Sequence, residues 1–413
     1  MELQTKTTKI DYNTFKIIPE HLGKGFGFCV YGDLSEEIEQ FAKECNFRIE
    51  KVNEKYTNFI PTDKTDFTKM FPEQSNFKFM DGFSPNLNKH LHIGHFSNLV
   101  LAKAFQCLGV SEKYVSILGD TLTGEVSKED ALNKFKEYCK EFNYKVDNIL
   151  FASEMKFDES KLTEGSGEYE GTKIIESGDT KIVAIKKDGS TSYFYQDIAL
   201  AQLLNDKTLY LTGYEQENHF KTLKEIFPFV NHIGLGLVKY QAQNKMDGRD
   251  NKRSGKMSTR LGNVIFMSDL LDDLTYEFNG NRLLAYNIFA GYILKNNPSS
   301  DKVFSMSTIK NPKNSPGLYF SYTVARLKSA GVEMSGQKDF FKQELQYNFL
   351  KSKSSLNPIY LFNALSDLCK EINALYTTHH IAGNEENKKM FGLLLSDLDF
   401  GMKKLGMFEI DKV

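Results

Sequence analysis

Residues 77–120 read FKFMDGFSPNLNKHLHIGHFSNLVLAKAFQCLGVSEKYVSILGD, and this stretch decides the fold. The apolar run FKFMDGF predicts a strand, and SPNLNKHLHI, with a proline and two asparagines, predicts a loop. From about Gly94 to Leu108, apolar side chains recur at helical spacing. YVSILGD then predicts a buried strand that ends at a Gly-Asp turn. Strand, loop, helix and strand form the βαβ unit of a parallel, doubly wound sheet, so we expect an α/β fold.

The whole chain divides into three predicted parts. Residues 1–72 predict a small α+β module, with a candidate hairpin GKGFGFCVYGD, an amphipathic stretch at 35–45 and the strand FRIEKV. Residues 73–310 predict a Rossmann-like sheet domain, in which KIVAI, TLYLTG and HIGLGLV continue the sheet and the segment of about 124–187 is an insertion. Residues 311–413 carry apolar side chains at three- and four-residue spacing and predict an all-α helix bundle.

The composition is that of a globular protein. The 413 residues are 40% hydrophobic and 26% charged, and at about 150 residues per domain they predict two or three domains. Because 52 Lys and Arg face 54 Asp and Glu, any nucleic-acid site must be a local basic patch. The five cysteines are scattered and argue against a disulfide framework or a zinc ribbon. With neither a signal peptide nor about 18 continuous apolar residues, we expect a cytoplasmic protein without membrane contact.

The first candidate site is KHLHIGH, residues 89–95. It would place two imidazoles and Gly94 at a helix N-terminus, where unpaired N–H groups and the helix dipole favour phosphate. His92 and His95, three residues apart, could donate to the same anion. A zinc site that included His90 would lack a nearby Cys or carboxylate to complete it, so no metal site is predicted. Taken alone, the motif would also fit a surface loop with three chance histidines.

The second candidate site is SGKMSTRLGN, residues 254–263. Its small residues, the cations Lys256 and Arg260, and hydroxyls such as that of Ser258 make a loop able to close on a polyphosphate. Residues 245–263 hold six Lys or Arg and two acids, which is the local basic patch that the net charge conceals. A solvated charged loop is the alternative for this segment by itself. The two motifs in this order, with a parallel sheet between them, form a far more specific signal.

PNLNKHLHIGH followed by GKMSTRLGN resembles the two signature motifs of class I aminoacyl-tRNA synthetases, and the detail is similar to the arginyl-tRNA synthetase branch. Further segments agree, in order, from Phe77 to the C-terminus: FSPN, LGDTLTG, KKDGSTSYFYQDIA, TGYEQENHF, HIGLGLV and LYFSYTVARLKSAG. The resemblance implies a Rossmann-like catalytic domain, a tRNA-contacting N-terminal module and a bundle like an anticodon-binding domain, the last two shortened. It also implies ATP-dependent activation of L-arginine and its transfer to the 3′ end of tRNA(Arg) by a monomer.

The resemblance further implies a pocket for the amino acid. A guanidinium is a planar, permanently charged group with five donors, and it needs a carboxylate, neutral acceptors and an aromatic face. Tyr193 and Asp197 are four residues apart, so on a helix they would share one face. By the resemblance, the arginine-binding residues are Ser84, Asn86, Glu154, Tyr193, Asp197 and Gln216. Each of them alone could equally be a structural residue.

The remaining implied residues concern ATP and tRNA. By the resemblance, ATP is bound by Lys89, Gly94, His219, Lys256, Met257 and Arg260. Catalysis is expected to stabilise charge on the phosphates, through His92, His95, Lys256 and Ser258. Mg²⁺ would accompany the nucleotide, and no protein-bound structural metal is expected. Contacts with tRNA are expected from Tyr319, Tyr322 and Arg326, for which packing within the bundle is an equal alternative.

Three features depart from the family pattern. Leu261 stands where the second motif usually has Lys, Phe96-Ser97 stands where the branch usually has Leu-Arg, and both terminal parts are short. Two alternatives therefore stay open: a truncated paralogue that adenylates arginine or a similar amino acid for another acceptor, and a non-catalytic tRNA-binding relative. The presence of both ATP motifs and of the Tyr193 and Asp197 pair speaks against the non-catalytic relative.

Overall fold

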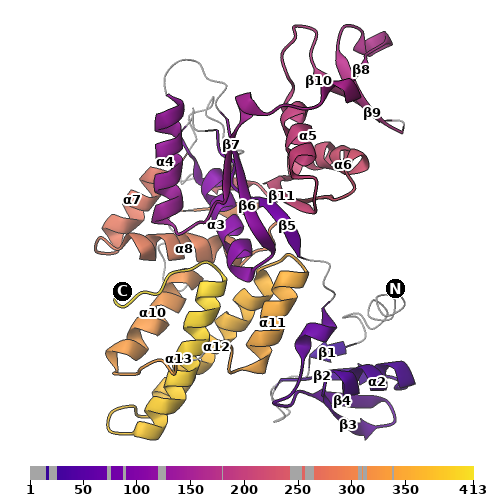
Figure 1. Cartoon of the computed structure of the whole chain (residues 1–413). Coiled ribbons are helices and arrows are strands. Elements are labelled where there is room, and N and C mark those ends of the chain that lie inside the picture. The colour runs from indigo at the N-terminus through magenta and orange to yellow at the C-terminus, as the bar shows by residue number, and fades with distance from the viewer. Residues whose placement is uncertain are drawn as a thin grey trace. The chain divides into compact units, whose positions relative to one another are not determined.

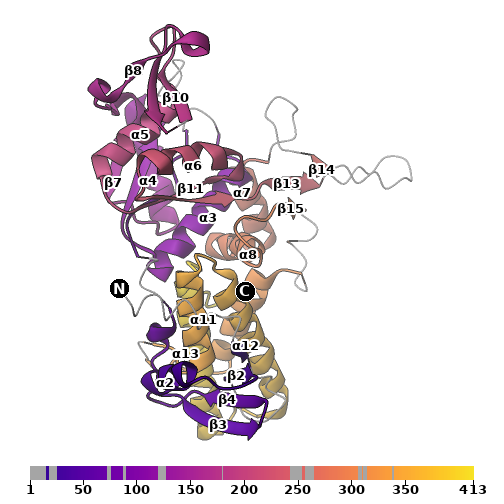
Figure 2. The ribbon, with the colours of Figure 1, turned by 90° about the vertical axis from the view of Figure 1, so that its right-hand side faces the viewer.

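The computed structural model describes residues 15–17, 26–71, 76–86, 90–119, 127–178, 180–241, 254–255, 265–305, 309, 314–336 and 339–413 (Figures 1 and 2). Within these ranges, no helix has both the length and the apolar character needed to cross a membrane. The chain forms two compact units, which we call the sheet unit (76–321, 405–411 and 413) and the bundle unit (1–75, 322–404 and 412). The predicted boundaries after residues 72 and 310 remain predictions.

Five parallel strands form the centre of the sheet unit, in the order β12-β11-β5-β6-β7. Figure 1 labels four of them, β11, β5, β6 and β7. Their bounds are β5 Phe77–Asp81, β6 Ser111–Leu118, β7 Asn148–Phe151, β11 Thr208–Gly213 and β12 Val230–Leu235. The first of these strands in the sequence, β5, lies in the middle, with β6 on one side and β11 on the other. This is the strand order of a doubly wound, Rossmann-like sheet, so the predicted fold class is confirmed.

Helix α3 (Ile93–Leu108) connects β5 to β6 and confirms the helix predicted from about Gly94 to Leu108. It begins after His92 and ends at Gly109, whose φ of 69° is a left-handed conformation that glycine adopts without strain. Most of its circumference is buried. A helix that is apolar on nearly all sides belongs in a core, so α3 is a fixed internal support for the loop before it.

Helix α4 (Lys128–Glu141) and strand β7 lie inside the segment 124–187 that was predicted to be an insertion. They complete a second βαβ connection, because β7 pairs in parallel with β6. The sequence concealed β7, since NILF is short and follows a charged helix. Beyond β7 the chain forms a separate antiparallel sheet of β8 (Thr163–Glu164), β9 (Lys173–Ser177) and β10 (Thr180–Ile185). KIVAI belongs to this smaller sheet, and the prediction that it continues the main sheet was wrong.

The sheet unit contains further helices, short helical turns and a third sheet. The helices are α5 (Tyr193–Leu204), α6 (Glu217–Ile226), α7 (Met267–Glu277), α8 (Arg282–Leu294) and the first part of α10 (Pro316–Ser329). The turns are η4 (Ala152–Glu154), η5 (Glu159–Lys161), η6 (Gly167–Tyr169) and η7 (Tyr214–Gln216). The third sheet has the order β14-β13-β15, formed by β13 (Val238–Gln241), β14 (Ser254–Gly255) and β15 (Lys302–Phe304).

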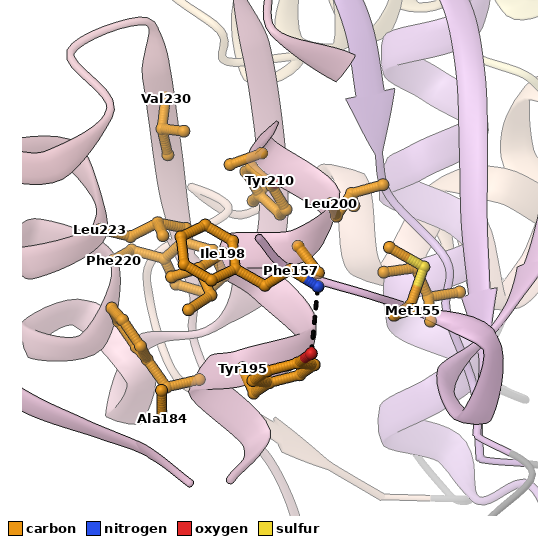
Figure 3. Close-up of a cluster of buried hydrophobic side chains, with 14 of the residues drawn as sticks. Met155, Phe157, Ala184, Tyr195, Ile198, Leu200, Tyr210, Phe220, Leu223 and Val230 are labelled. Carbon is orange, nitrogen blue, oxygen red and sulfur yellow. Dashed lines mark hydrogen bonds between the residues drawn. The ribbon is translucent and has the colours of Figure 1, made fainter. Parts of the chain in front are cut away.

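A buried cluster joins the main sheet to the helices α5 and α6 and to the smaller sheet. Figure 3 shows Ile198 of α5, Phe220 of α6 and Tyr210 of β11 among its side chains. The Tyr195 hydroxyl accepts a hydrogen bond from the backbone N–H of Phe157, at 3.1 Å (Figure 3). Helix α5 is therefore fixed to the main sheet by apolar packing and to the segment before β8 by a buried hydrogen bond.

The bundle unit combines the N-terminal module with helices from the C-terminal part of the chain. Its antiparallel sheet has the order β1-β2-β4-β3, formed by β1 (Phe15–Ile17), β2 (Phe28–Tyr31), β3 (Arg48–Asn53) and β4 (Tyr56–Ile60). Its helical elements are α2 (Glu36–Glu44), η2 (Phe67–Met70), α11 (Gln343–Ser354), α12 (Ile359–Thr378) and α13 (Glu385–Lys404). The predicted amphipathic helix and the predicted helix bundle are confirmed, while the described part of the predicted hairpin is the single strand β2.

Candidate active site

The strand order reverses between β5 and β11, so we expect a ligand-binding crevice where these two strands lie side by side. In an open parallel sheet, ligands bind beyond the carboxyl ends of the strands at the point where the strand order reverses. Here β5 ends at Asp81 and β11 ends at Gly213, and Tyr210 of β11 is the register partner of Asp81. The chain after β5 leads to the first histidine motif, and the chain after β11 leads to η7 and α6. Both segments that carried candidate residues therefore start at this crevice.

The first motif forms the N-terminus of α3. His92 is the N-cap: its Nδ1 accepts from the N–H of Gly94 at 3.1 Å, while its own N–H donates to Nδ1 of His95 at 3.2 Å. The two rings lie 4.0 Å apart, and burial lowers the pKa of His92. Because both Nδ1 atoms accept, each neutral ring carries its proton on Nε2, the atom that can donate to a phosphate oxygen. This arrangement agrees with the predicted phosphate site.

The segment that follows the second motif is bonded to the first. The N–H of Ile93 donates to the carbonyl of Ile265 at 3.1 Å, and the N–H of Met267 donates to the carbonyl of Leu91 at 2.8 Å. His92 and Phe266 form the bridge between these two bonds. The end of the second loop is therefore attached beside the helix start. Five predicted residues lie outside the described residues: Lys89, Lys256, Met257, Ser258 and Arg260.

Helix α5 presents a carboxylate that is paired with a histidine. Asp197 Oδ2 lies 2.6 Å from Nε2 of His219, and about a quarter of each side chain is exposed (22% and 24%). The His219 ring packs edge-on against Phe194 and Phe220. Tyr193 is the first residue of α5, one turn before Asp197, so the predicted helical spacing of the pair is confirmed. His219, predicted on the nucleotide side, instead contacts the predicted arginine-binding acid.

Asp81 is a candidate residue that the sequence analysis missed. It is 7% exposed at the end of β5, and it accepts a hydrogen bond from the Ser84 hydroxyl, whose oxygen in turn accepts from the N–H of Ile117 at 2.8 Å. Burial raises the pKa of Asp81 to about 7, and the charge of Asp197 acts in the same direction. The signal in the sequence is a single acid at the end of an apolar run, separated from FSPN (83–86) by Gly82 alone.

The other predicted pocket residues lie at different places along the sheet edge. Asn86 forms a parallel bridge with Gly119, where a Cβ would lie only 3.0 Å from Cγ of Asn86. Gln216 is an exposed N-cap residue of α6 that makes no capping hydrogen bond with its side chain. Glu154 follows β7, the edge strand, and its carboxylate pairs with Lys128 at 2.9 Å. The structure brings Ser84 and Asn86 to the end of β5 but leaves Glu154 two strands away from it.

The predicted tRNA-contacting residues all lie on α10. Tyr322 is exposed and Tyr319 is half-buried. The Arg326 guanidinium lies over the ring of Tyr376 at 3.8 Å and donates to the Asn373 side chain at 3.0 Å. Arg326 therefore has a packing role in the bundle unit, whatever it contacts in addition.

The chemistry of the crevice differs between its two sides. On one side, a helix N-terminus with two imidazoles suits a polyanion. On the other, Asp81 and Asp197 are two acids whose charges disfavour each other, which suits a cationic ligand. Within the described ranges, no cluster of three or more His, Cys, Asp or Glu side chains could hold a metal ion.

Known proteins are similar to this chain in sequence and in fold. A family described as "tRNA synthetases class I (R), catalytic domain" matches residues 157–278. The arginine–tRNA ligase of Flavobacterium psychrophilum is 24% identical over 546 aligned positions, which cover 95% of this chain and 88% of that protein. The arginine–tRNA ligase of Clostridium botulinum strain Langeland is 27% identical over 327 positions, covering 64% of this chain and only 56% of that protein.

A solved structure shows the same architecture. The arginyl-tRNA synthetase of Thermus thermophilus superposes with a TM-score of 0.63, at 14% sequence identity, over 100% of this chain and 98% of that one. At this identity the likeness concerns the fold. It agrees with the strand order and with the C-terminal helices described above.

Proposed function

We propose that this chain is a class I aminoacyl-tRNA synthetase of the arginyl branch, which activates L-arginine with ATP and transfers it to the 3′ end of tRNA(Arg). The observation that carries the proposal is the crevice between β5 and β11, with its two acids and its histidine-capped helix. Few substrate pairs need both a cation site and a polyphosphate site side by side. Arginine and ATP are such a pair.

The two acids support arginine as the amino acid. Asp81 is buried, and its carboxyl is neutral below a pKa of about 7 because it is buried and because Asp197 is near. A permanently charged guanidinium between them would stabilise both carboxylates and could donate to each. Tyr193 is the first residue of α5, one turn before Asp197, and is proposed to supply the aromatic surface for the guanidinium. We propose Asp81, Asp197 and Tyr193 as the residues that hold the side chain of arginine.

The activation step needs positioning and charge stabilisation rather than a covalent enzyme intermediate. An oxygen of the arginine carboxylate attacks the α-phosphorus of ATP, the new O–P bond forms, and the bond to the β-phosphate oxygen breaks to release pyrophosphate. Nε2–H groups of His92 and His95, together with the N–H groups at the start of α3, would stabilise charge on the phosphates. Lys256, Ser258 and Arg260 of the second motif are proposed to add donors. Mg²⁺ would enter with ATP as part of the substrate.

The transfer step uses the product of the first. A hydroxyl of the 3′-terminal ribose of tRNA attacks the acyl carbon of the adenylate, and AMP leaves with the electron pair of the broken acyl–phosphate bond. The proton of the hydroxyl passes to a phosphate oxygen of the leaving AMP or to solvent. This step requires no nucleophilic side chain of the enzyme.

The experiment that tests the proposal is charging of total tRNA with each amino acid in turn. We expect ATP-dependent charging with arginine alone. ATP–pyrophosphate exchange, measured with and without tRNA, then separates the alternatives. Arginine-dependent exchange that requires tRNA supports the proposed ligase. Exchange without any RNA, combined with no charging, would instead identify a paralogue with another acceptor. The absence of both reactions would overturn the proposal in favour of a non-catalytic relative.

A further inference from the structure

The C-terminal segment Leu405–Asp411 follows the last helix of the bundle in sequence, yet it belongs to the sheet unit by its contacts. Leu405, Met407 and Ile410 are all buried. Gly406 has a φ of 73°, and a Cβ at this position would lie 2.9 Å from Cγ of Lys103 on α3. Both the backbone conformation and the close approach therefore require glycine. The segment is packed into the sheet unit rather than lying on its surface.

The backbone of Phe408, within this segment, is held by hydrogen bonds to a buried side chain. Asn287, fully buried on α8, accepts from the N–H of Phe408 at 2.8 Å and donates to the carbonyl of Phe408 at 2.7 Å. The same amide donates to the Ser321 hydroxyl at 3.1 Å, and that hydroxyl donates to the carbonyl of Gly317. Asn287 thus satisfies both backbone groups of Phe408, as a neighbouring strand would. Such a pair of bonds fixes the position of one residue.

The ring of Phe408 is held by a buried cation. The Lys103 ammonium lies 3.5 Å from the centroid of the Phe408 ring and 4.6 Å from that of Tyr286, and Lys103 is 3% exposed. Burial lowers the pKa of Lys103 to about 7, whereas the two rings attract the charged form. Cation–π attraction is stronger where water is excluded, so this buried contact is expected to stabilise more than the same contact at the surface would.

Aromatic contacts continue from this point to the first turn of α3. The Phe408 ring packs edge-on against Tyr286 of α8 at 5.1 Å. Tyr286 contacts Phe96 at 5.9 Å, and Phe96 stacks face to face on Phe289 at 4.4 Å with an interplanar angle of 4°. Phe96 is the residue directly after His95. Helices α3 and α8, which these rings connect, pack against each other (Figures 1 and 2).

We propose that Phe408 is a positioning residue for the first turn of α3. Lys103 and Asn287 hold Phe408 in place. The packed rings of Tyr286, Phe96 and Phe289 connect Phe408 to the first turn of α3, so a shift of Phe408 would shift the backbone that carries His92 and His95. The segment 405–411 is thereby part of the catalytic machinery, although it does not contact the crevice residues described above. This inference rests on the proposed function insofar as it concerns rate. In a reaction governed by positioning, a shift of about 1 Å can cost up to about a hundredfold in rate.

The competing view is that the segment only adds stability to the sheet unit. The two views differ in kinetics. A positioning role changes kcat for adenylation, because the histidines face the phosphates, and leaves KM for arginine unchanged, because Asp81 and Asp197 lie on β5 and α5. A stability role alone lowers the melting temperature and leaves both constants of the folded enzyme unchanged.

The test is tRNA-dependent pyrophosphate exchange by the full chain with Phe408→Leu, which keeps the apolar volume and removes the ring. We expect kcat to fall on the order of tenfold, with KM for arginine within about twofold of the parent. Lys103→Met should also lower kcat. The fall in kcat of the double variant Phe408→Leu/Lys103→Met should be smaller than the product of the two single falls, because both variants break the same contact. Phe408→Tyr and Lys103→Arg, which keep the ring and the cation, should restore most of the rate.

Matched controls are Phe341→Leu, at a ring that is 55% exposed, and Lys136→Met, at an exposed lysine of α4. Neither should alter kcat. An unchanged kcat in folded Phe408→Leu would overturn the proposal. So would a loss that Phe408→Tyr fails to restore. Parallel losses of kcat and arginine affinity that follow the fraction of unfolded protein would favour the stability role and also overturn it.

A second measurement does not depend on activity. Hydrogen exchange of the peptide that contains residues 93–105 should become faster in Phe408→Leu, while exchange in β5 stays as in the parent. Equal exchange of α3 in both proteins would contradict the proposal. If the parent protein fails to activate arginine, the proposed function fails, whereas this measurement still decides whether Phe408 holds α3.

Discussion

Asp197 is the side chain on which discrimination among amino acids should depend. Its carboxylate is half-buried and bonded to His219 at 2.6 Å, which fixes its direction. We expect Asp197→Ala to raise KM for arginine about a hundredfold or more, because a charge-assisted bond to a guanidinium is lost, and to leave KM for ATP within about twofold. Pyrophosphate exchange at varied arginine and ATP checks this. Asp273→Ala, at an exposed acid of α7, is the control. Unchanged arginine affinity in Asp197→Ala would remove the pocket assignment.

Asp81 should make arginine binding depend on pH. With a pKa raised to about 7, its carboxyl is protonated in the free enzyme below that value, whereas binding of a guanidinium needs the carboxylate. KM for arginine should therefore fall as the pH rises from 6 to about 7, by at most about tenfold per unit, and then level off. The neighbouring acid is Asp197, while burial raises the pKa of Tyr210 and Tyr144 well above this range. Asp81→Asn should bind arginine more weakly and without this dependence.

The same carboxyl should affect stability. Between about pH 4 and pH 7, Asp81 is protonated in the folded chain and ionised in the unfolded chain. The free energy of unfolding should therefore fall as the pH rises from about 4 to about 7. The slope from this group is at most about 1.4 kcal/mol per pH unit. Denaturant titrations of the parent and of Asp81→Asn at several pH values isolate it as a difference. Equal pH dependence in the two proteins would show that Asp81 is not the group responsible.

Individual site residues were predictable where a motif marks them and not elsewhere. The spacing of His92 and His95 predicts a shared first turn, and the structure shows it as mutual capping. Asp81 was missed because one acid at the end of a strand has no periodic signal, and only the parallel pairing with β11 shows that it lies at the crevice. The prediction of Glu154 as an arginine-binding residue depends on the family resemblance alone. It follows β7, which the sequence did not reveal as an edge strand.

At the scale of one element, the cap of helix α5 should affect both the stability of the protein and its affinity for arginine. The Ser192 oxygen accepts from the N–H of Tyr195 at 3.2 Å, and its hydroxyl donates to the carbonyl of Val183 at 2.7 Å, which attaches the helix start to β10. We expect Ser192→Ala to cost about 1 kcal/mol of stability, as lost caps do. Because Tyr193 and Asp197 lie on the first two turns of this helix, KM for arginine should also rise several-fold.

A matched variant separates the two effects of Ser192→Ala. Ser35 caps α2 in the bundle unit in the same way, by accepting from the N–H of Ile38. Ser35→Ala should therefore destabilise by a similar amount and leave KM for arginine as in the parent. Thermal unfolding and pyrophosphate exchange of both variants provide the comparison. A rise in KM for both, or for neither, would contradict the coupling.

Helices were predictable from the sequence, and the assignment of strands to sheets was only partly so. Helix α3 matches its predicted segment, and α12 and α13 lie within the predicted helix bundle, because their apolar residues recur at helical spacing. The sequence pattern of a strand is short and does not indicate which other strands pair with it. KIVAI and NILF show this: the first pairs in the small antiparallel sheet and the second extends the main one. Only hydrogen-bond partners distant in sequence decide between these outcomes.

At the scale of the whole molecule, the composition of the bundle unit was not predictable. The N-terminal module and the helices near the C-terminus share one aromatic core, in which Tyr347 of α11 contacts Phe28 at 4.9 Å and Phe71 at 5.4 Å. These residues come from opposite ends of the chain, so no local pattern connects them. The module therefore lacks part of its core when α11 is absent. The two predicted parts should behave as one folding unit.

This gives a prediction for the whole unit. Tyr347→Ala should reduce the free energy of unfolding of the bundle unit by about 3–5 kcal/mol, as removal of a buried aromatic side chain does. Hydrogen exchange should become faster in β2 and β4 and in α11 together, while β5 and α3 of the sheet unit keep their protection. Tyr276→Ala, at a ring that is 90% exposed on α7, is the control and should change neither. If exchange rises in α11 while β2 and β4 stay protected, the module folds independently, and the division into three separate domains is the better description.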